Sequence, residues 1–335
     1  MANPRFAVLV GSESLLGREV RDIVATSEPG FSLRLIAAEG EEPGRLTRVG
    51  DEPVAVLELD SLNLSGACAV LLAGSPASSR KAIELTEAEG TPIIDLGFAA
   101  EDRPDVRLRA PLLEARQEEE ADRRIHVIAH PAAIALSLLL RRLHASDPLR
   151  RAVVQIFVPA SEQGKAGVEE LQQQTISLLS FKPLPHQVFD TQLSFNMLAR
   201  YGDAAPVPLE DTETRIERHL ATLLHLPGEG LGAPLPSLRV VQAPVFHGYT
   251  FGIWAEFENA PDREAVESGL ATANIDVRSG EFEPPTNLGQ AGQGGVAVGA
   301  IAGDRNCPNA LWLWMAADNY RLAAESGVAV ARSLL

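Results

Sequence analysis

In the first 130 residues, short apolar runs alternate with helical stretches, and this alternation constrains the fold more than any other feature. Turns that contain Gly, Ser or Pro separate the apolar runs from stretches of helix-forming residues. Because strands joined through helices return to the same end of a sheet, they pair in parallel. Three or more such strand–helix units therefore predict an α/β fold class with a Rossmann-type, doubly wound parallel sheet. The predicted strands are 6–10, 33–38, 69–75, 91–97 and 127–129.

The second half of the chain has a different pattern. Strand-like runs predominate there, and fewer helices separate them. This pattern predicts an α+β region built on a mixed, mainly antiparallel sheet. The predicted strands are 151–159, 238–243, 251–257, 295–302 and 310–316, and the predicted helices are 168–179, 209–224 and 263–271. The last segment, 318–335, is predicted to form an amphipathic helix.

Composition excludes several classes of function. The chain has 335 residues and a formal net charge of −16, which disfavours binding to nucleic acid or to an anionic membrane surface. The two cysteines, Cys68 and Cys307, form neither a disulfide framework nor a CxxC motif, so no metal site is predicted. The sequence contains no recognisable leader segment and no apolar run of membrane-spanning length, so we expect a cytoplasmic protein.

A glycine-bounded turn at 11–17 follows the first strand, which is the context that a dinucleotide site requires. Ser14 replaces the middle glycine that lets a backbone approach a pyrophosphate, so the motif is weak and a purely structural turn is an equal alternative. Glu39, Glu41 and Glu42 would repel a 2′-phosphate and so favour NAD over NADP, unless they form only a solvated loop. The residues expected to approach a dinucleotide are Gly11, Ser12, Glu13, Ser14, Leu15, Leu16, Glu39, Gly74 and Ser75.

A strand, a sharp turn and a helix follow one another at 125–142. Pro131 suits the first helical turn, and the backbone N–H groups of such a helix start can bind a small anionic ligand. The turn itself holds no Ser, Thr, Cys, Asp, Glu or Lys, and His130 is expected to be a helix-cap residue. Ser161 is expected to be the N-cap of the helix at 168–179.

Taken together, these segments resemble the aspartate-semialdehyde dehydrogenase family along nearly the whole chain. The resemblance is carried by 11–17, Leu72-Ala73-Gly74-Ser75, Ile93-Ile94-Asp95, 127–131, 161–171, 244–250 and Asp318-Asn319-Tyr320-Arg321. It implies an NAD(P)-binding domain at 1–130 completed by the helix 318–335, and a dimerisation and substrate domain at 131–317. It also implies a homodimer, and a reaction that reduces aspartyl phosphate through a cysteine thioester with NADPH as the hydride donor.

The chain departs from this family at each position that carries the chemistry, so no catalytic residue is intact. The nucleophilic cysteine falls on Ala133, whose methyl group cannot form a thioester. The general-base histidine falls on Tyr249, a poor base at neutral pH, and the substrate-binding arginine falls on Gln242. A conserved glutamine of the family falls on Val158, and Glu162 replaces a glycine. The chain thus resembles the cysteine-less, Usg-type members.

Neighbouring side chains are weak replacements for the lost groups. Ser137 lies one helical turn after Ala133 and is expected to point into the core, and Cys307 is expected in a loop. His247 is expected on the surface of a turn, with a position toward the pocket as the alternative.

Three functions remain open on these residues. We expect a non-catalytic, dimeric homologue that binds a nucleotide weakly and has a binding or regulatory role. One alternative is an oxidoreductase of changed substrate and mechanism that uses Tyr249 or His247 together with Glu162. The other is a structural partner that forms heterodimers with a true dehydrogenase.

Overall fold

A computed structural model describes residues 5–27, 29–114, 124–280 and 282–335. The chain divides into two compact units, Met1–Ala129 with Ala323–Leu335, and His130–Leu322. The assignment of a dinucleotide-binding role to 1–130 with 318–335, and of a dimerisation and substrate role to 131–317, stays a prediction. Residues 1–4, where the sequence predicts no leader segment, lie outside the described residues.

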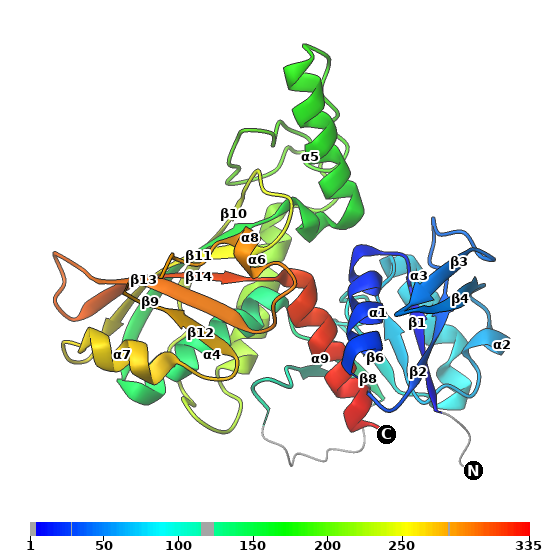
Figure 1. The fold of residues 1–335 in the computed structure, drawn as a ribbon, viewed down its shortest axis with the longest axis horizontal. Helices are drawn as coiled ribbons and strands as arrows, with labels where there is room; N and C mark the ends of the chain where they lie inside the picture. The colour runs from blue at the N-terminus through cyan, green and yellow to red at the C-terminus, as the bar shows by residue number, and fades with distance from the viewer. Residues whose placement is uncertain (1–4, 28, 115–123, 281) are drawn as a thin grey trace. The chain divides into compact units, whose positions relative to one another are not determined.

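The first unit is built on an eight-stranded sheet in the order β3-β4-β2-β1-β5-β6-β8-β7 (Figure 1). Every pair of neighbouring strands is parallel except β3 and β4, which are antiparallel. The chain leaves β1 on one side toward β2 and returns on the other side as β5, so the strand order reverses beside β1. The strands are β1 (Phe6–Val10), β2 (Ser32–Ile36), β3 (Leu46–Val49), β4 (Glu52–Leu57), β5 (Val70–Leu72), β6 (Ile93–Asp95), β7 (Val106–Arg109) and β8 (Ile125–Ile128).

This sheet confirms the predicted doubly wound fold. Its central strands are almost wholly buried because helices cover both faces of such a sheet, which is why they read as continuous apolar runs. The helices of this unit are α1 (Leu15–Ser27), α2 (Ser61–Leu64), α3 (Pro76–Leu85), the short 3₁₀ helix η1 (Glu87–Glu89) and most of α9 (Asn319–Ser333).

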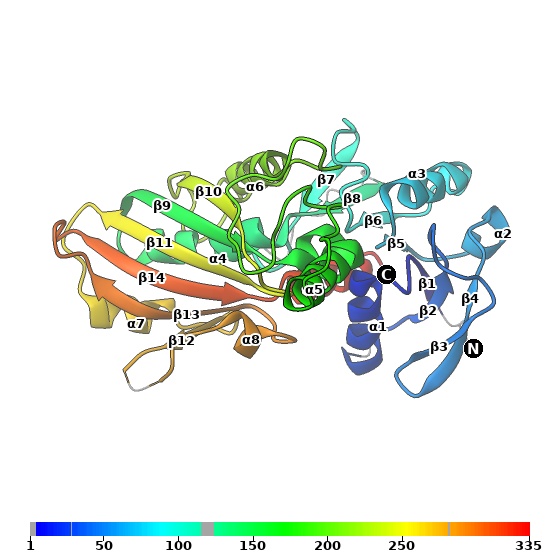
Figure 2. The same ribbon diagram turned by 90° about the horizontal axis from the view of Figure 1, so that it is seen from above.

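The second unit contains a six-stranded sheet in the order β10-β9-β11-β14-β13-β12, which Figure 2 shows from above. The three central pairings are antiparallel, and both edge strands pair in parallel with their neighbours. The sheet is therefore mixed and mainly antiparallel, as predicted. Its strands are β9 (Leu149–Val158), β10 (Ser237–Gln242), β11 (Tyr249–Phe257), β12 (Ile275–Arg278), β13 (Val296–Gly303) and β14 (Ala310–Ala317).

Helix α4 (Pro131–Ser146) is the buried centre of the second unit. It packs against α6 (Leu209–Leu223), α7 (Arg263–Leu270) and β9, and most of its residues are buried. A helix covered on several sides must be apolar around its circumference, which explains the run of Ala, Ile and Leu. In contrast, α5 (Gly164–Leu179) extends away from the sheet of this unit (Figure 1). A short helix, α8 (Asn287–Gln290), precedes β13.

The prediction that Ser161 caps the following helix is wrong. Ser161 lies within a short 3₁₀ helix, η2 (Ala160–Gln163), and the residue before α5 is Gln163. The Ser161 hydroxyl hydrogen-bonds to His247 and Asn319, so it is not available to a helix terminus.

Within the described ranges, no helix is both long enough and apolar enough to cross a membrane.

Candidate functional site

The candidate site begins at the first turn of α4. His130 is the N-cap, and its Nδ1 accepts a hydrogen bond from the Ala132 N–H at 3.2 Å. This confirms the predicted cap role of His130. The backbone N–H of His130 in turn donates to His219 Nδ1 at 2.9 Å. Ala133 follows as a fully buried methyl group, so the position expected for a nucleophile carries no reactive atom.

A largely buried carboxylate, with 11% of its side chain exposed, faces this helix start. Glu162 comes from η2, and its Oε1 lies 3.0 Å from His130 Nε2. The Tyr249 hydroxyl, at the first position of β11, donates a hydrogen bond to the other carboxylate oxygen. Because Nδ1 of His130 accepts from the backbone N–H of Ala132, Nε2 carries a proton and donates it to Glu162. Both oxygens of Glu162 therefore receive a hydrogen bond.

Burial and mutual contact shift the pKa values of this cluster in opposite directions. Burial by itself would raise the pKa of Glu162, but its interaction with His130, the Tyr249 hydrogen bond and the charge of Arg215 hold that pKa below its ordinary value. Burial, and then the negative charge of Glu162, raise the pKa of Tyr249 well above its ordinary value. At neutral pH the cluster thus holds a carboxylate and a protonated phenol, and the phenol cannot serve as a base.

Gln242, the position expected for a substrate-binding arginine, is fully buried and directed into the protein. Its amide nitrogen donates to the carbonyl oxygens of Val158 and Ala243, each at 2.9 Å. Its amide oxygen accepts a hydrogen bond from the Tyr201 hydroxyl at 2.6 Å. The hydrogen-bonding groups of this side chain are therefore used to join β9, β10 and the segment around Tyr201.

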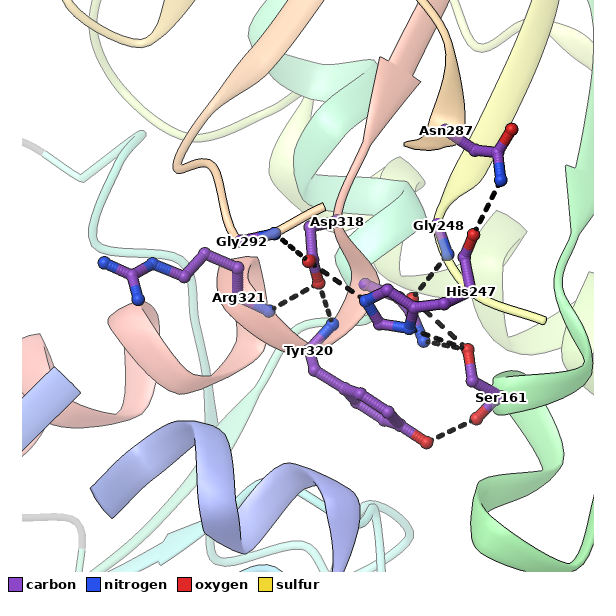
Figure 3. Close-up of polar contacts among 9 residues, drawn as sticks. Ser161, His247, Gly248, Asn287, Gly292, Asp318, Tyr320 and Arg321 are labelled. Carbon is purple, nitrogen blue, oxygen red and sulfur yellow. Dashed lines mark hydrogen bonds and ion pairs between the residues drawn. The ribbon is translucent and has the colours of Figure 1, made fainter. Parts of the chain in front are cut away.

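A second polar array adjoins the first, because Ser161 precedes Glu162 in the chain. Figure 3 shows the contacts of Ser161 within this second array. Ser161 Oγ lies 3.1 Å from His247 Nδ1, and His247 Nε2 lies 3.0 Å from Asp318 Oδ2. Asn319 Nδ2 donates to Ser161 Oγ at 3.1 Å, and the Tyr320 hydroxyl donates to the Ser161 carbonyl oxygen at 2.6 Å. The array links η2, the turn before β11 and the start of α9.

Asp318 anchors this array. Its Oδ1 accepts from the N–H groups of Tyr320 and Arg321 in the first turn of α9, and its Oδ2 accepts from Gly292 N–H at 2.7 Å. Burial by itself would raise the pKa of Asp318, but the hydrogen bond and charge of His247 outweigh it, so its pKa lies below the ordinary value. Nε2 of His247 donates to this carboxylate, and Nδ1 lies against the Ser161 hydroxyl.

His247 lies in the turn before β11 and is partly exposed, as the first of the two sequence-based expectations has it, but its ring is also bound within the protein. Its side chain is about one-third exposed, with 31% of its surface accessible, yet both ring nitrogens have partners within the protein. Its order of contacts also differs from a hydrolase triad, in which Nε2 faces the serine and Nδ1 faces the aspartate. Ser161 is almost completely buried, so the array is suited to fixing η2 in place.

The glycine turn of the first unit has the close packing of a Rossmann turn. Gly11 has φ of +82°, and a Cβ there would lie 2.4 Å from the Cα of Gly74, so only glycine fits. Ser14 Oγ accepts from Gly17 N–H and donates to the Ala73 carbonyl oxygen, each at 2.8 Å. Ser14 thus caps α1 and joins it to the end of β5.

Acidic side chains surround this turn. Glu41 Oε1 accepts from Glu13 N–H at 3.1 Å, and Oε2 accepts from Ala38 N–H at 3.0 Å. Glu13 forms an ion pair with Arg21 at 2.8 Å. A cavity of about 400 Å³ opens beside Glu41, and its lining includes Glu39, Glu58, Ser78 and Lys81.

The structure joins Glu162 to Tyr249, which one sequence-based alternative had grouped, and adds His130 to them. Glu162 and Tyr249 meet His130, whereas Ala133 and Gln242 add no free polar group to them. Sequence reasoning missed Tyr201, Asp318 and Asn319 as partners. For Asp318 and Asn319 the sequence signal is the 318–321 segment, which carries a resemblance without indicating contacts, and Tyr201 lies outside the segments that carry the resemblance. Among the described residues, no group of three or more His, Cys, Asp or Glu side chains could hold a metal ion.

Comparison with known proteins places these features in context. The family profile described as semialdehyde dehydrogenase, dimerisation domain, matches residues 140–322. The chain is 29% identical to the USG-1 protein homolog of Pseudomonas aeruginosa, over all of this chain and 98% of that protein. It is 27% identical to an aspartate-semialdehyde dehydrogenase of Rickettsia bellii, over 98% of this chain and 96% of that protein.

Solved structures agree with the sequence comparisons. A probable aspartate-semialdehyde dehydrogenase from P. aeruginosa superposes with a TM-score of 0.82 at 26% identity, covering 98% of this chain and 97% of its own. The Vibrio cholerae aspartate semialdehyde dehydrogenase II complexed with ASA has a TM-score of 0.83 at 22% identity, with coverage of 100% and 98%. At 22% identity this second likeness shows the shared fold alone.

Proposed function

The chain belongs to the aspartate-semialdehyde dehydrogenase family, and on that premise we propose that it is a homologue that does not catalyse the family's reaction. Its role is then one of binding or regulation, carried out by the fold and not by covalent chemistry. The reaction in question passes through a cysteine thioester, and this chain has Ala133 at the corresponding position.

One observation carries the proposal: the Tyr249 hydroxyl donates to the buried Glu162 carboxylate. A base must accept a proton near neutral pH, and the pKa of this phenol lies well above 10. The phenol also sits beside a negative charge, which opposes the formation of a thiolate or phenolate nearby. The buried methyl group of Ala133 and the inward-directed amide of Gln242 support the same conclusion.

The test is a direct assay of the family reaction. The protein is purified from a host that lacks its own aspartate-semialdehyde dehydrogenase. Aspartate semialdehyde, phosphate and NADP⁺ are supplied, and the reduction of NADP⁺ to NADPH is followed. We expect no turnover above the buffer rate, while a cysteine-containing relative prepared in parallel is active. Phosphate-dependent turnover by the wild-type chain that is lost in Tyr249→Phe would refute the proposal.

We further propose that any dinucleotide bound at the 11–17 turn is NAD and that it binds weakly. The support is electrostatic: Glu39, Glu41 and Glu58 line the cavity beside the turn, with Lys81 as a cation in the same lining. A ribose with free hydroxyls can donate to these carboxylates, whereas a 2′-phosphate is repelled by them. Glu41 also occupies the Glu13 N–H, one of the backbone donors that a pyrophosphate could use. The proposed preference for NAD would distinguish this chain from the Candida albicans aspartate semialdehyde dehydrogenase, whose structure was solved with NADP and has a TM-score of 0.68 at 15% identity.

A homodimer is the assembly that we propose. The matched family profile is a dimerisation domain, and the outward face of the second sheet carries half-exposed Val153 and Trp312. These two side chains line a cavity of about 470 Å³ together with Leu235 and Trp254. Exposed aromatic and aliphatic side chains gathered in this way are typical of protein interfaces.

An oxidoreductase of changed mechanism is the second candidate, favoured by the Ser161–His247–Asp318 array. In it, His247 Nδ1 accepts from a hydroxyl, so it could receive a proton during a reaction. The test is substitution in any newly found activity. Loss of that activity in His247→Gln favours this candidate, and unchanged activity eliminates it.

A further inference from the structure

We propose that His130 and Tyr249 form a carboxylate-binding site and that Glu162 occupies it in the native chain as an internal ligand. The ligand class is a small monocarboxylate, or the terminal carboxylate of a larger molecule. The two donors would bind this ligand class whether or not the chain catalyses a reaction.

The two donors come from elements other than the one that supplies the carboxylate. His130 belongs to the N-cap of α4 and Tyr249 to the start of β11, whereas Glu162 enters from η2. The backbone N–H of Ala132 fixes the His130 ring so that Nε2–H points at Glu162. The rings of His130 and Tyr249 are almost completely buried, and Phe251 lies beside Tyr249 with ring centroids 5.9 Å apart. The donor pair is therefore held in place without help from the carboxylate.

The backbone of η2 is also held independently of the Glu162 side chain. Ala160 N–H donates to the Val245 carbonyl oxygen at 2.7 Å, and Ser161 N–H donates to the Phe246 carbonyl oxygen at 3.0 Å. The Tyr320 hydroxyl donates to the Ser161 carbonyl oxygen. Truncation of Glu162 is thus expected to leave the loop in place and to open a space that ends at the two donors.

The geometry and charge of this space match a carboxylate. His130 and Tyr249 approach different oxygens of the same group, which is how two donors bind a planar anion with two oxygens. The positive charge of Arg215 acts on the same position, since it helps to keep the pKa of Glu162 low. Removal of the Glu162 carboxylate leaves the hydrogen bonds of His130 and Tyr249 to it unmade, which lowers the free energy of unfolding. An added carboxylate that fits the space should therefore bind there and stabilise the variant.

The experiment is chemical rescue of Glu162→Ala. Acetate has the same number of non-hydrogen atoms as this substitution removes, and acetamide is its uncharged counterpart. Thermal unfolding is followed at pH 7 in sodium acetate and in sodium chloride of equal ionic strength. We expect acetate to raise the Tm of Glu162→Ala with saturation, by several degrees more than chloride or acetamide. Addition of Tyr249→Phe should weaken acetate binding by roughly tenfold, because one donor to a charged group is lost.

Wild type and Glu162→Gln are the matched controls, because both keep the space filled. Neither should show an acetate effect beyond that of chloride. Glu162→Ser is measured in parallel, so that the result does not depend on the folding of one variant. Equal stabilisation of the controls by acetate would overturn the proposal, and so would the absence of an acetate-specific effect in both truncated variants.

Discussion

Removal of the Tyr249 hydroxyl tests the physical basis of the candidate site. Tyr249→Phe keeps the ring, which is 1% exposed, and deletes only the oxygen that donates to Glu162. No cavity larger than one atom forms, so loss of packing contributes little. What changes is that one oxygen of a buried carboxylate loses its donor.

The expected effect is large for a single atom. Hydrogen bonds to charged groups contribute about 1.5–3 kcal/mol, against about 0.5–1.5 kcal/mol for neutral pairs. We therefore expect Tyr249→Phe to lower the free energy of unfolding of the second unit by about 2 kcal/mol. Tyr201→Phe is the matched control, because that buried hydroxyl donates to the neutral amide of Gln242. Its expected loss is about 1 kcal/mol.

Tryptophan fluorescence isolates the unit of interest. The three tryptophans of the chain, Trp254, Trp312 and Trp314, all lie in β11 and β14 of the second unit. Urea unfolding followed by their emission thus reports on the unit that contains Glu162 and Tyr249. A double-mutant cycle with Glu162→Gln should give a coupling free energy of at least about 1 kcal/mol.

The pH dependence adds a second criterion. The folded-state pKa of Glu162 lies below its ordinary value of 4.5, so its stabilising contribution is present above that value and is lost as the pH falls through the folded pKa. The penalty of Tyr249→Phe should therefore shrink as the pH falls through the folded-state pKa of Glu162. A penalty under about 0.5 kcal/mol at pH 7, or a penalty that stays constant while Glu162 is titrated to its protonated form, would show that this hydrogen bond does not stabilise an ionised Glu162.

Three further predictions concern other parts of the chain. Burial and the charge of Arg109 lower the pKa of His126 to about 4, so its NMR signals should remain those of a neutral imidazole down to pH 5. The free energy of unfolding should therefore decrease as the pH falls below 6.5, the ordinary pKa of histidine. A titration midpoint of the His126 signals above pH 6 would contradict this prediction. NADP should raise the Tm of Glu41→Ala by more than it raises the Tm of wild type, because the substitution removes a carboxylate from the cavity and frees the Glu13 N–H. An equal Tm shift with NADP in both proteins would exclude Glu41 as the group that selects against the 2′-phosphate. Trp312→Glu places a charge on the outward face of the second sheet and should shift the mass measured by light scattering from dimer to monomer, while an unaltered dimer would place the interface elsewhere.

The buried strands could be predicted from the sequence because their signal is local. Strand β1 is a continuous apolar run, and its predicted bounds agree with the structure. The antiparallel pair β3 and β4 was missed, because β3 is half-exposed and carries a charged residue. The Gly50-Asp51 turn between them is the signal that could have identified it. Strand β7 was missed for a similar reason, since arginines alternate along it and none of its residues is fully buried.

The contacts of the site could not be predicted in the same way, because its residues are far apart in the chain. Glu162 lies 32 residues from His130 and 87 from Tyr249. The resemblance implied that Glu162 replaces a glycine and that Tyr249 stands where a histidine is expected, and one alternative used the two residues together. It did not indicate the hydrogen bond between them or the contact with His130, because those depend on the path of η2 between β9 and α5.

The substitutions in the pocket are best understood as one linked set. His247 and Tyr249 flank Gly248, and they contact the neighbouring residues Ser161 and Glu162 respectively. Each carboxylate, hydroxyl or imidazole of these two arrays has a partner, as buried polar groups require. A histidine placed at 249 would find Glu162 already held by His130. Substitution of one position therefore leaves the contacts of the others in place, so the residues of the two arrays have to be changed together to alter the site.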